Sequence, residues 1–265
     1  MKKIKYTLTI IAIVLSFYFT DKLMILVDNK NPLMQTIIKE ETNYNIKPVN
    51  AEIKDNTIIP GLKGKKVNRH KSLIKMEEFS KFNELYLEYD EITPDISLKD
   101  NKDKIIIKGN KLKNKVALIL ENNQTLEQYL QDNNIKYSYI TKLNSNLTLK
   151  REYINGEQEK DNFSNLNSIL NKNKLNSKIC LIQYSNIEYC KSKKYYIVNT
   201  SLNLNNGIIN SLNKLSSGDI ILINSSTSLN NLKLLLNEIN KQDLQIDYLS
   251  NVINENNWKI IKNLL

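Results

Sequence analysis

Residues 115 to 123 read Lys-Val-Ala-Leu-Ile-Leu-Glu-Asn-Asn, a continuous apolar run that ends in polar side chains. Such a run is typical of a strand that is buried on both faces of a parallel sheet. Similar short apolar runs recur along the rest of the chain. The strands that we predict are Val116–Leu120, Tyr137–Ile140, Ile179–Gln183, Tyr196–Asn199, Ile220–Ile223 and Gln245–Tyr248.

Helical patterns separate these runs, at Thr125–Asp132, Phe163–Leu170, Gly207–Leu215 and Leu229–Ile239. Alternation of strands and helices predicts an α/β fold on parallel strands, in which Val116–Leu120 and Ile220–Ile223 are parallel and buried. The region 115–265 is much shorter than the roughly 250 residues of an eight-unit barrel. We therefore expect a reduced or incomplete (β/α) barrel.

The N-terminal segment has the pattern of a signal anchor. Three lysines, Lys2, Lys3 and Lys5, precede an uncharged stretch from Tyr6 to Thr20, and Leu23–Val27 resumes the apolar run. Because no small-x-small cleavage site follows, we expect residues 1–27 to be an uncleaved membrane anchor. With the lysines on the inner side, the bulk of the chain is expected outside the cell membrane as a single-pass protein.

Two further segments precede the α/β region. Residues 28–45 read as a short helix or stalk around one apolar patch. Residues 46–114 hold short β-branched runs, turn residues such as Pro60-Gly61, and a helical stretch Ser72–Phe82. This composition predicts a small α+β accessory module.

Composition restricts the chemistry. The net charge is +10, and His70 is the chain's one histidine, so a site of two or three imidazoles cannot be built within this chain. Nucleic acid is not an expected partner, since the basic residues lie outside the membrane. Cys180 and Cys190 are ten residues apart and either pair in a disulfide or stay as two buried thiols.

The quoted stretch resembles the opening motif of the polysaccharide deacetylases, carbohydrate esterase family four, in which this strand reads K-V-A-L-T-F-D-D-G. In this resemblance Glu121 falls on the general-base aspartate and Asn122 on the metal-binding aspartate. The stretch from Gly218 to Asn224 resembles the family's late strand G-S-I-I-L-L-H, with Asn224 in place of the catalytic histidine. Asn56 through Met76 resembles an accessory module of some anchored members.

The resemblance implies a scaffold without its reaction. Members of the family hold a divalent metal with one Asp and two His of an H-x-x-x-H motif, which this chain lacks. We therefore expect no metal, no cofactor and no catalytic residues, and a degenerate homologue that has lost at least one strand–helix unit within Thr141–Lys160. A remnant cleft would bind cell-wall glycan or a partner protein. Its expected residues are Glu121, Asn122, Gln183 and Asn224, whose amides suit sugar hydroxyl groups.

Two alternatives stay open at this stage. One is an active carbohydrate hydrolase with a non-standard site on the same scaffold, for which Ser225, Ser226 and Asp219 are the candidate residues. The other is an assembly partner of an active paralogue. The sequence does not fix the oligomeric state.

Overall fold

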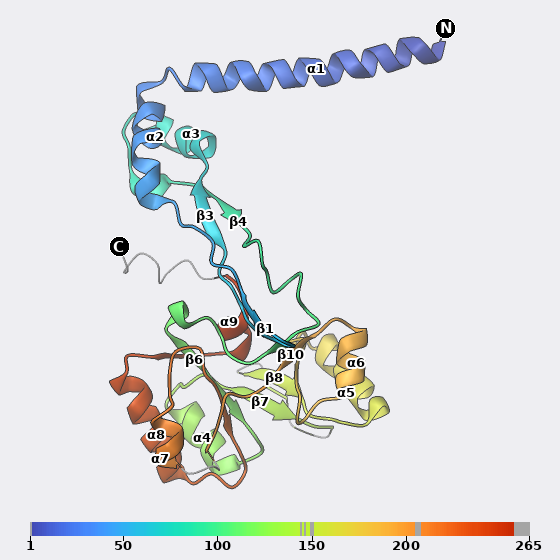
Figure 1. Ribbon diagram of the computed structural model, residues 1–265, viewed down its shortest axis with the longest axis vertical. Helices are drawn as coiled ribbons and strands as arrows, with labels where there is room; N and C mark the ends of the chain where they lie inside the picture. The colour runs from blue at the N-terminus through green and yellow to red at the C-terminus, as the bar shows by residue number, and fades with distance from the viewer. Residues whose placement is uncertain (1, 144, 146, 149–150, 205–207, 257–265) are drawn as a thin grey trace. The chain divides into compact units, whose positions relative to one another are not determined.

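The computed structural model describes residues 2–143, 145, 147–148, 151–204 and 208–256 (Figure 1). The chain divides into two compact units. Unit 1 consists of Met1–Lys47 and Gly64–Ile92, and unit 2 consists of Pro48–Lys63 and Thr93–Leu265.

Unit 1 is a small α+β body around one apolar cluster. Its elements are α1 (Lys2–Asp28), α2 (Pro32–Tyr44), β3 (Gly64–Val67), α3 (Arg69–Glu77), η1 (Glu84–Tyr86) and β4 (Tyr89–Ile92). Asn31 and Asn68 are the N-caps of α2 and α3. Their side chains accept hydrogen bonds from backbone N–H groups that have no partner within the helix. The two helices pack through Met34, Ile37 and Leu73.

Helix α1 forms where an anchor was expected. Among the described residues, no helix combines the length and the apolar character that a membrane crossing requires.

Unit 2 is built on two sheets. The first has the order β11 (Leu202–Asn203), β12 (Ile220–Ile223), β6 (Lys115–Leu120), β7 (Ser138–Thr141) and β8 (Glu152–Asn155), with β13 (Gln245–Asp247) also paired to β6. The second has the order β1 (Glu52–Lys54), β2 (Thr57–Ile59), β5 (Ile105–Ile106), β10 (Tyr196–Val198) and β9 (Ile179–Leu181). The helical segments are η2 (Lys111–Lys113), α4 (Gln124–Asp132), α5 (Lys160–Lys172), α6 (Ile187–Ser192), α7 (Ile208–Leu212), α8 (Leu229–Lys241) and α9 (Leu249–Ile253).

The two sheets are linked at two points. A parallel bridge between Tyr153 and Asn176 links β8 to the residues that enter β9. The chain leaving β10 also turns to β12 of the first sheet, where the Ser201 N–H donates to the Ile220 carbonyl at 2.9 Å. Strands β6, β12 and β7 are parallel, and all their residues except Lys115 are buried, which confirms the predicted α/β fold on parallel strands.

Both faces of β6 are covered, which explains its continuous apolar run. Ala117 and Ile119 belong to the cluster shared by the two sheets, which Leu249 and Val252 of α9 complete. The alternate residues, such as Leu118, face the cluster that contains the apolar sides of α4 and α8. A strand in this position is apolar along nearly its whole length.

Two features of unit 2 differ from the sequence-based expectations. Thr141–Lys160 holds a strand that was not predicted, because β8 lies within it and buries Tyr153 and Ile154. Residues 46–114 are not one module, because β2 pairs in parallel with β5, and β5 with β10 of the α/β region. Only its middle part, from Gly64 to Ile92, joins the N-terminal helices in unit 1.

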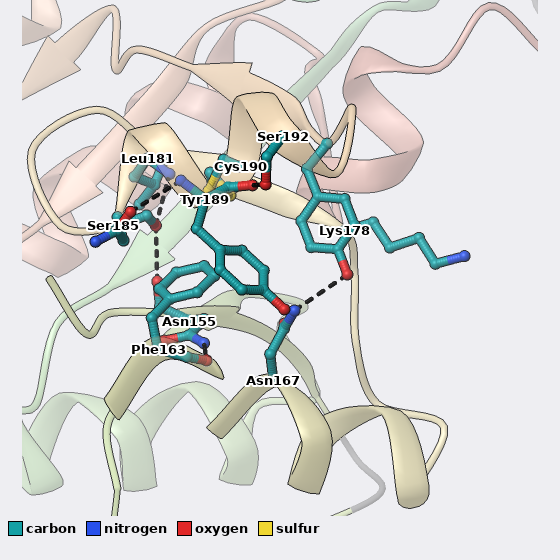
Figure 2. The surroundings of a disulfide bond; sticks show 12 residues. Asn155, Phe163, Asn167, Lys178, Leu181, Ser185, Tyr189, Cys190 and Ser192 are labelled. Carbon is teal, nitrogen blue, oxygen red and sulfur yellow. Dashed lines mark hydrogen bonds between the residues drawn. A yellow bond between two sulfur atoms is a disulfide. The ribbon is translucent and has the colours of Figure 1, made fainter. Parts of the chain in front are cut away.

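The two cysteines form a disulfide between β9 and α6, with a Cα–Cα distance of 6.5 Å between Cys180 and Cys190. Both cysteines are fully buried, and the rings of Phe163 and Tyr189 pack beside them (Figure 2). The centroids of these two rings are 5.1 Å apart. The same region holds Ser185, whose hydroxyl donates to the Asn155 carbonyl at 2.7 Å and so joins the loop after β9 to β8.

Removing the disulfide should destabilise unit 2. We expect Cys180→Ala/Cys190→Ala to lower the free energy of unfolding by about 2 to 4 kcal/mol, because the cross-link no longer restricts the unfolded chain. Urea unfolding followed by circular dichroism measures this loss, and the natural chain in reducing agent is the matched control. Equal stability of the natural chain with and without reductant would contradict the disulfide.

Lys113 is a lysine buried beside α9. Its ammonium group donates to the Asn251 carbonyl at 2.8 Å, to the Asn254 side-chain oxygen at 2.9 Å and to the Asn254 carbonyl. Burial, followed by the charge of Lys115, lowers the pKa of Lys113 to about 7, although Asp247 and Glu255 act in the opposite direction. A group whose pKa is lower in the folded state than in the unfolded state makes stability depend on pH.

The sign of this dependence is testable. Between pH 7 and about 10.5 the unfolded chain holds the Lys113 proton that the folded chain releases, so stability should rise with pH, by at most about 1.4 kcal/mol per pH unit. We expect Lys113→Met to remove this rise and the exposed control Lys111→Met to retain it, as measured by urea unfolding from pH 6 to pH 10. The same pH slope in both variants would contradict the assignment.

Candidate functional site

A cleft lies at the carboxyl ends of the parallel strands in unit 2. Because parallel strands end at the same edge, the residues that follow β6, β7, β9 and β12 come together there. The resulting cavity has a volume of about 330 Å³. We call it the carboxyl-end cleft, and its lining residues are Glu121, Asn122, Tyr139, Ile140, Lys142, Ser145, Tyr184 and Ser225.

Glu121 ties the strand ends together. One carboxylate oxygen accepts the Ser225 N–H at 2.8 Å, which joins the end of β6 to the end of β12. Burial, followed by the charge of Glu121 and a hydrogen bond to it, raises the pKa of Tyr184. Tyr184 therefore keeps its phenolic proton at neutral pH and presents a hydroxyl group at the carboxylate.

The two asparagines after Glu121 have different roles. Asn122 is exposed in the cleft, and its side-chain oxygen accepts the Tyr139 hydroxyl at 3.3 Å. Asn123 caps α4 by accepting the Leu126 N–H at 3.1 Å, and its amide donates to the Ser225 carbonyl at 3.0 Å. Asn122 is thus available to a ligand, whereas Asn123 maintains the local backbone.

The structure separates the other two expected cleft residues from this pair. Asn224 is buried: its amide donates to the Asn203 side chain at 3.2 Å, and its oxygen accepts the Thr227 hydroxyl at 2.8 Å. Gln183 lines an adjoining hollow of about 400 Å³, which shares Lys142 and Tyr184 with the cleft. Asn224 therefore supports the loop after β12 and does not line the cleft.

The residues considered for a non-standard hydrolase lie apart. Asp219 precedes β12 and is fully buried, with the Lys108 ammonium at 2.7 Å and the Ser201 hydroxyl at 2.7 Å from the same carboxylate oxygen. Ser225 follows the other end of β12, roughly 20 Å away at about 3.3 Å per residue. Asp219 cannot act together with Ser225.

The residues present do not fit the divalent metal that the deacetylase resemblance implies. Within the part of the chain that the structure describes, no three His, Cys, Asp or Glu side chains are grouped so as to hold a metal ion. Asn122 offers only a neutral amide, and Asn224 is engaged by its own loop. His70 belongs to unit 1, where its Nδ1 lies 2.7 Å from the Asp28 carboxylate.

Sequence reasoning missed several cleft residues. A second hollow of about 460 Å³ shares Asn122 and Tyr139 with the cleft and is also lined by Arg151. The Arg151 guanidinium lies 5.1 Å from the Tyr139 ring centre and forms an ion pair with Glu127. The signal that could have identified Tyr139 and Tyr184 is their place at the ends of predicted strands, where polar and aromatic side chains meet a ligand.

Comparison with known proteins identifies solved structures with a similar fold. No family model matches the chain. The crystal structure of wild-type BA3943 from Bacillus anthracis, described as a CE4 family pseudoenzyme, is similar with a TM-score of 0.59 at 17% sequence identity, over 84% of this chain and 95% of that one. The fold is that of the CE4 family.

Two further proteins are similar to this chain. A BA3943 mutant described as having restored enzymatic activity has the same TM-score of 0.59 and identity of 17%, over 84% of this chain and 98% of that one. The uncharacterized protein YlxY of Bacillus subtilis is 36% identical over 106 residues, which are 38% of this chain and 33% of YlxY. The match thus spans about a third of that curated relative.

Proposed function

We propose that this chain is a degenerate CE4-type protein that binds glycan in the carboxyl-end cleft without deacetylating it. The observation that carries the proposal is the composition of the cleft, which keeps a carboxylate, an amide and two tyrosines where the fold places its ligands. Its described lining residues include no imidazole. Similarity in fold to a CE4 pseudoenzyme supports the same conclusion.

The chemistry of the cleft suits a sugar chain. The amide of Asn122 and the hydroxyl of Ser225 can exchange hydrogen bonds with sugar hydroxyl groups, and the Tyr184 ring can pack against an apolar sugar face. The cleft shares residues with a hollow on either side, so three hollows adjoin. This succession favours an oligosaccharide over a single sugar.

Deacetylation would need groups that the cleft does not supply. The family's reaction uses a metal to polarise the acetamide carbonyl and a base to activate water. Glu121 stands at the position of the base, but its carboxylate accepts the Ser225 N–H, and Asn224 has no proton to give near neutral pH. The mutant of BA3943 described as restored in activity supports the view that this fold persists when its chemistry is lost.

Binding without turnover is the expected result with a model glycan. We expect triacetylchitotriose to bind the full chain by isothermal titration calorimetry, with at least tenfold weaker binding to Tyr184→Ala and to Asn122→Ala, because each removes a direct contact. Asn165→Ala, at an exposed position of α5, is the matched control. Acetate release with Zn²⁺ or Co²⁺ should not exceed that of buffer.

Two results would contradict this proposal. Metal-stimulated acetate release that disappears in Glu121→Ala would show an active hydrolase with Glu121 as its base. Equal glycan affinity of Tyr184→Ala and Asn165→Ala would show that the glycan does not bind in the cleft.

We also propose that the chain is held at the cell membrane by its N-terminal helix, with the residues after that helix outside. The cluster of Lys2, Lys3 and Lys5 before an uncharged stretch supports this orientation. The disulfide between Cys180 and Cys190 supports an oxidising compartment.

The location is tested in intact cells. We expect the full chain in the membrane fraction and its digestion by protease added outside, because the anchor leaves residues beyond it exposed. A cytoplasmic protein of the same cells is the control for lysis. Recovery of the full-length chain in the soluble cytoplasmic fraction would overturn this proposal.

A further inference from the structure

A second cavity of unit 2, with a volume of about 530 Å³, lies at the opposite end of the strands from the carboxyl-end cleft. It is formed where β9 and β10 begin, since Ile179 and Tyr196 are the first residues of these strands. We call it the amino-end pocket. Its volume lies within the range of about 300 to 1,000 Å³ that is usual for small-molecule sites.

The floor of the amino-end pocket is apolar and its edge is cationic. Leu98 and Ile253 are buried beneath it, and Tyr196 contributes a partly buried ring. Lys99 and Lys102 lie at the edge. Within the described ranges neither of these lysines has a carboxylate partner, although Lys102 lies 5.2 Å from the Tyr196 ring centre.

The other charged residue pair of the lining does not cancel the positive charge of Lys99 and Lys102. Lys63 also lines the pocket, and the one carboxylate among its described lining residues is that of Glu255. An oxygen of Glu255 already accepts the Leu98 N–H at 2.8 Å. The ammonium groups of Lys99 and Lys102 therefore outnumber the carboxylate of Glu255, and the local field favours an anion.

Tyr196 gives the pocket a preference for a ring. Burial, followed by the charge of Glu255, raises the pKa of Tyr196, so its phenol stays neutral. The hydroxyl groups of Ser177 and Ser250 and the amide of Asn254 complete the polar part of the lining. An anion held by Lys102 would lie beside the Tyr196 ring, with a ring-shaped body over the apolar floor.

We infer that the amino-end pocket is a binding site for an anionic sugar, a pyranose ring that carries a phosphate or carboxylate group. The anion is bound by Lys99 and Lys102, and the ring packs on Tyr196. The site is separate from the carboxyl-end cleft, because Ser177 and Ile179 lie where β9 begins, whereas Tyr184 of the cleft follows the end of β9. It does not depend on the glycan-binding proposal.

The test compares four small probes on the full chain by isothermal titration calorimetry. Glucose 6-phosphate and glucuronic acid carry both ring and anion, glucose carries only the ring, and inorganic phosphate only the anion. We expect at least one of the two anionic sugars to bind, at least tenfold more tightly than either glucose or phosphate. The stronger of the two identifies which anion the site takes.

Variants assign the binding to the pocket. Lys99→Ala/Lys102→Ala should weaken binding of the anionic sugar at least tenfold. Lys160→Ala/Lys172→Ala, which removes two exposed lysines of α5, should leave this affinity unchanged. Tyr196→Leu should also weaken it, with circular dichroism to verify the fold. Binding of neither anionic sugar at 10 mM, or equal loss in the two lysine pairs, would overturn the inference.

Discussion

Burial of β6 on both faces is the constraint on which unit 2 depends. The strand pairs in parallel with β12, β7 and β13, so its backbone holds the first sheet together. Its side chains fill the shared cluster between the sheets on one face and the cluster under α4 and α8 on the other. The first residue free of this packing is Glu121, which is why polar side chains begin at that point.

The same constraint keeps the carboxyl ends of the strands together, whichever residues stand there. Positions at the carboxyl ends of β6 and β12 stay close because the strands stay paired, whatever their side chains do. The Glu121 carboxylate accepts a hydrogen bond from the Ser225 N–H, and the Asn224 side-chain oxygen accepts one from the Thr227 hydroxyl. These contacts stabilise the strand ends, so residues that resemble catalytic positions serve as local structure.

The sequence predicted the parts of the fold whose signal is continuous. Val116–Leu120 and Ile220–Ile223 are apolar at every position, and the sequence predicts both that they are strands and that they are parallel. Strand β8 was missed because its four residues follow a long polar run and show no clear period. The parallel pairing of β2 with β5 was also not predictable, since it joins segments separated by unit 1.

Prediction of the site was limited in a similar way. The position of Glu121 and Asn122 follows from the end of a predicted strand, and the structure places both in the cleft. The burial of Asn224 depends on Asn203 and Thr227, which lie on loops whose approach no local pattern encodes. The place of Asp219 could have been read from the sequence, because it precedes Ile220–Ile223 and so lies at the other end of the strand.

We propose that the deacetylase fold surrounds a cleft that binds sugar and has no metal site. The decisive measurement is a crystal structure of the chain grown with triacetylchitotriose and Zn²⁺. We expect sugar density against Tyr184, between Glu121 and Ser225, and no zinc anomalous signal in the cleft. Zinc bound at Asn122 or Glu121 beneath a sugar acetamide would contradict it.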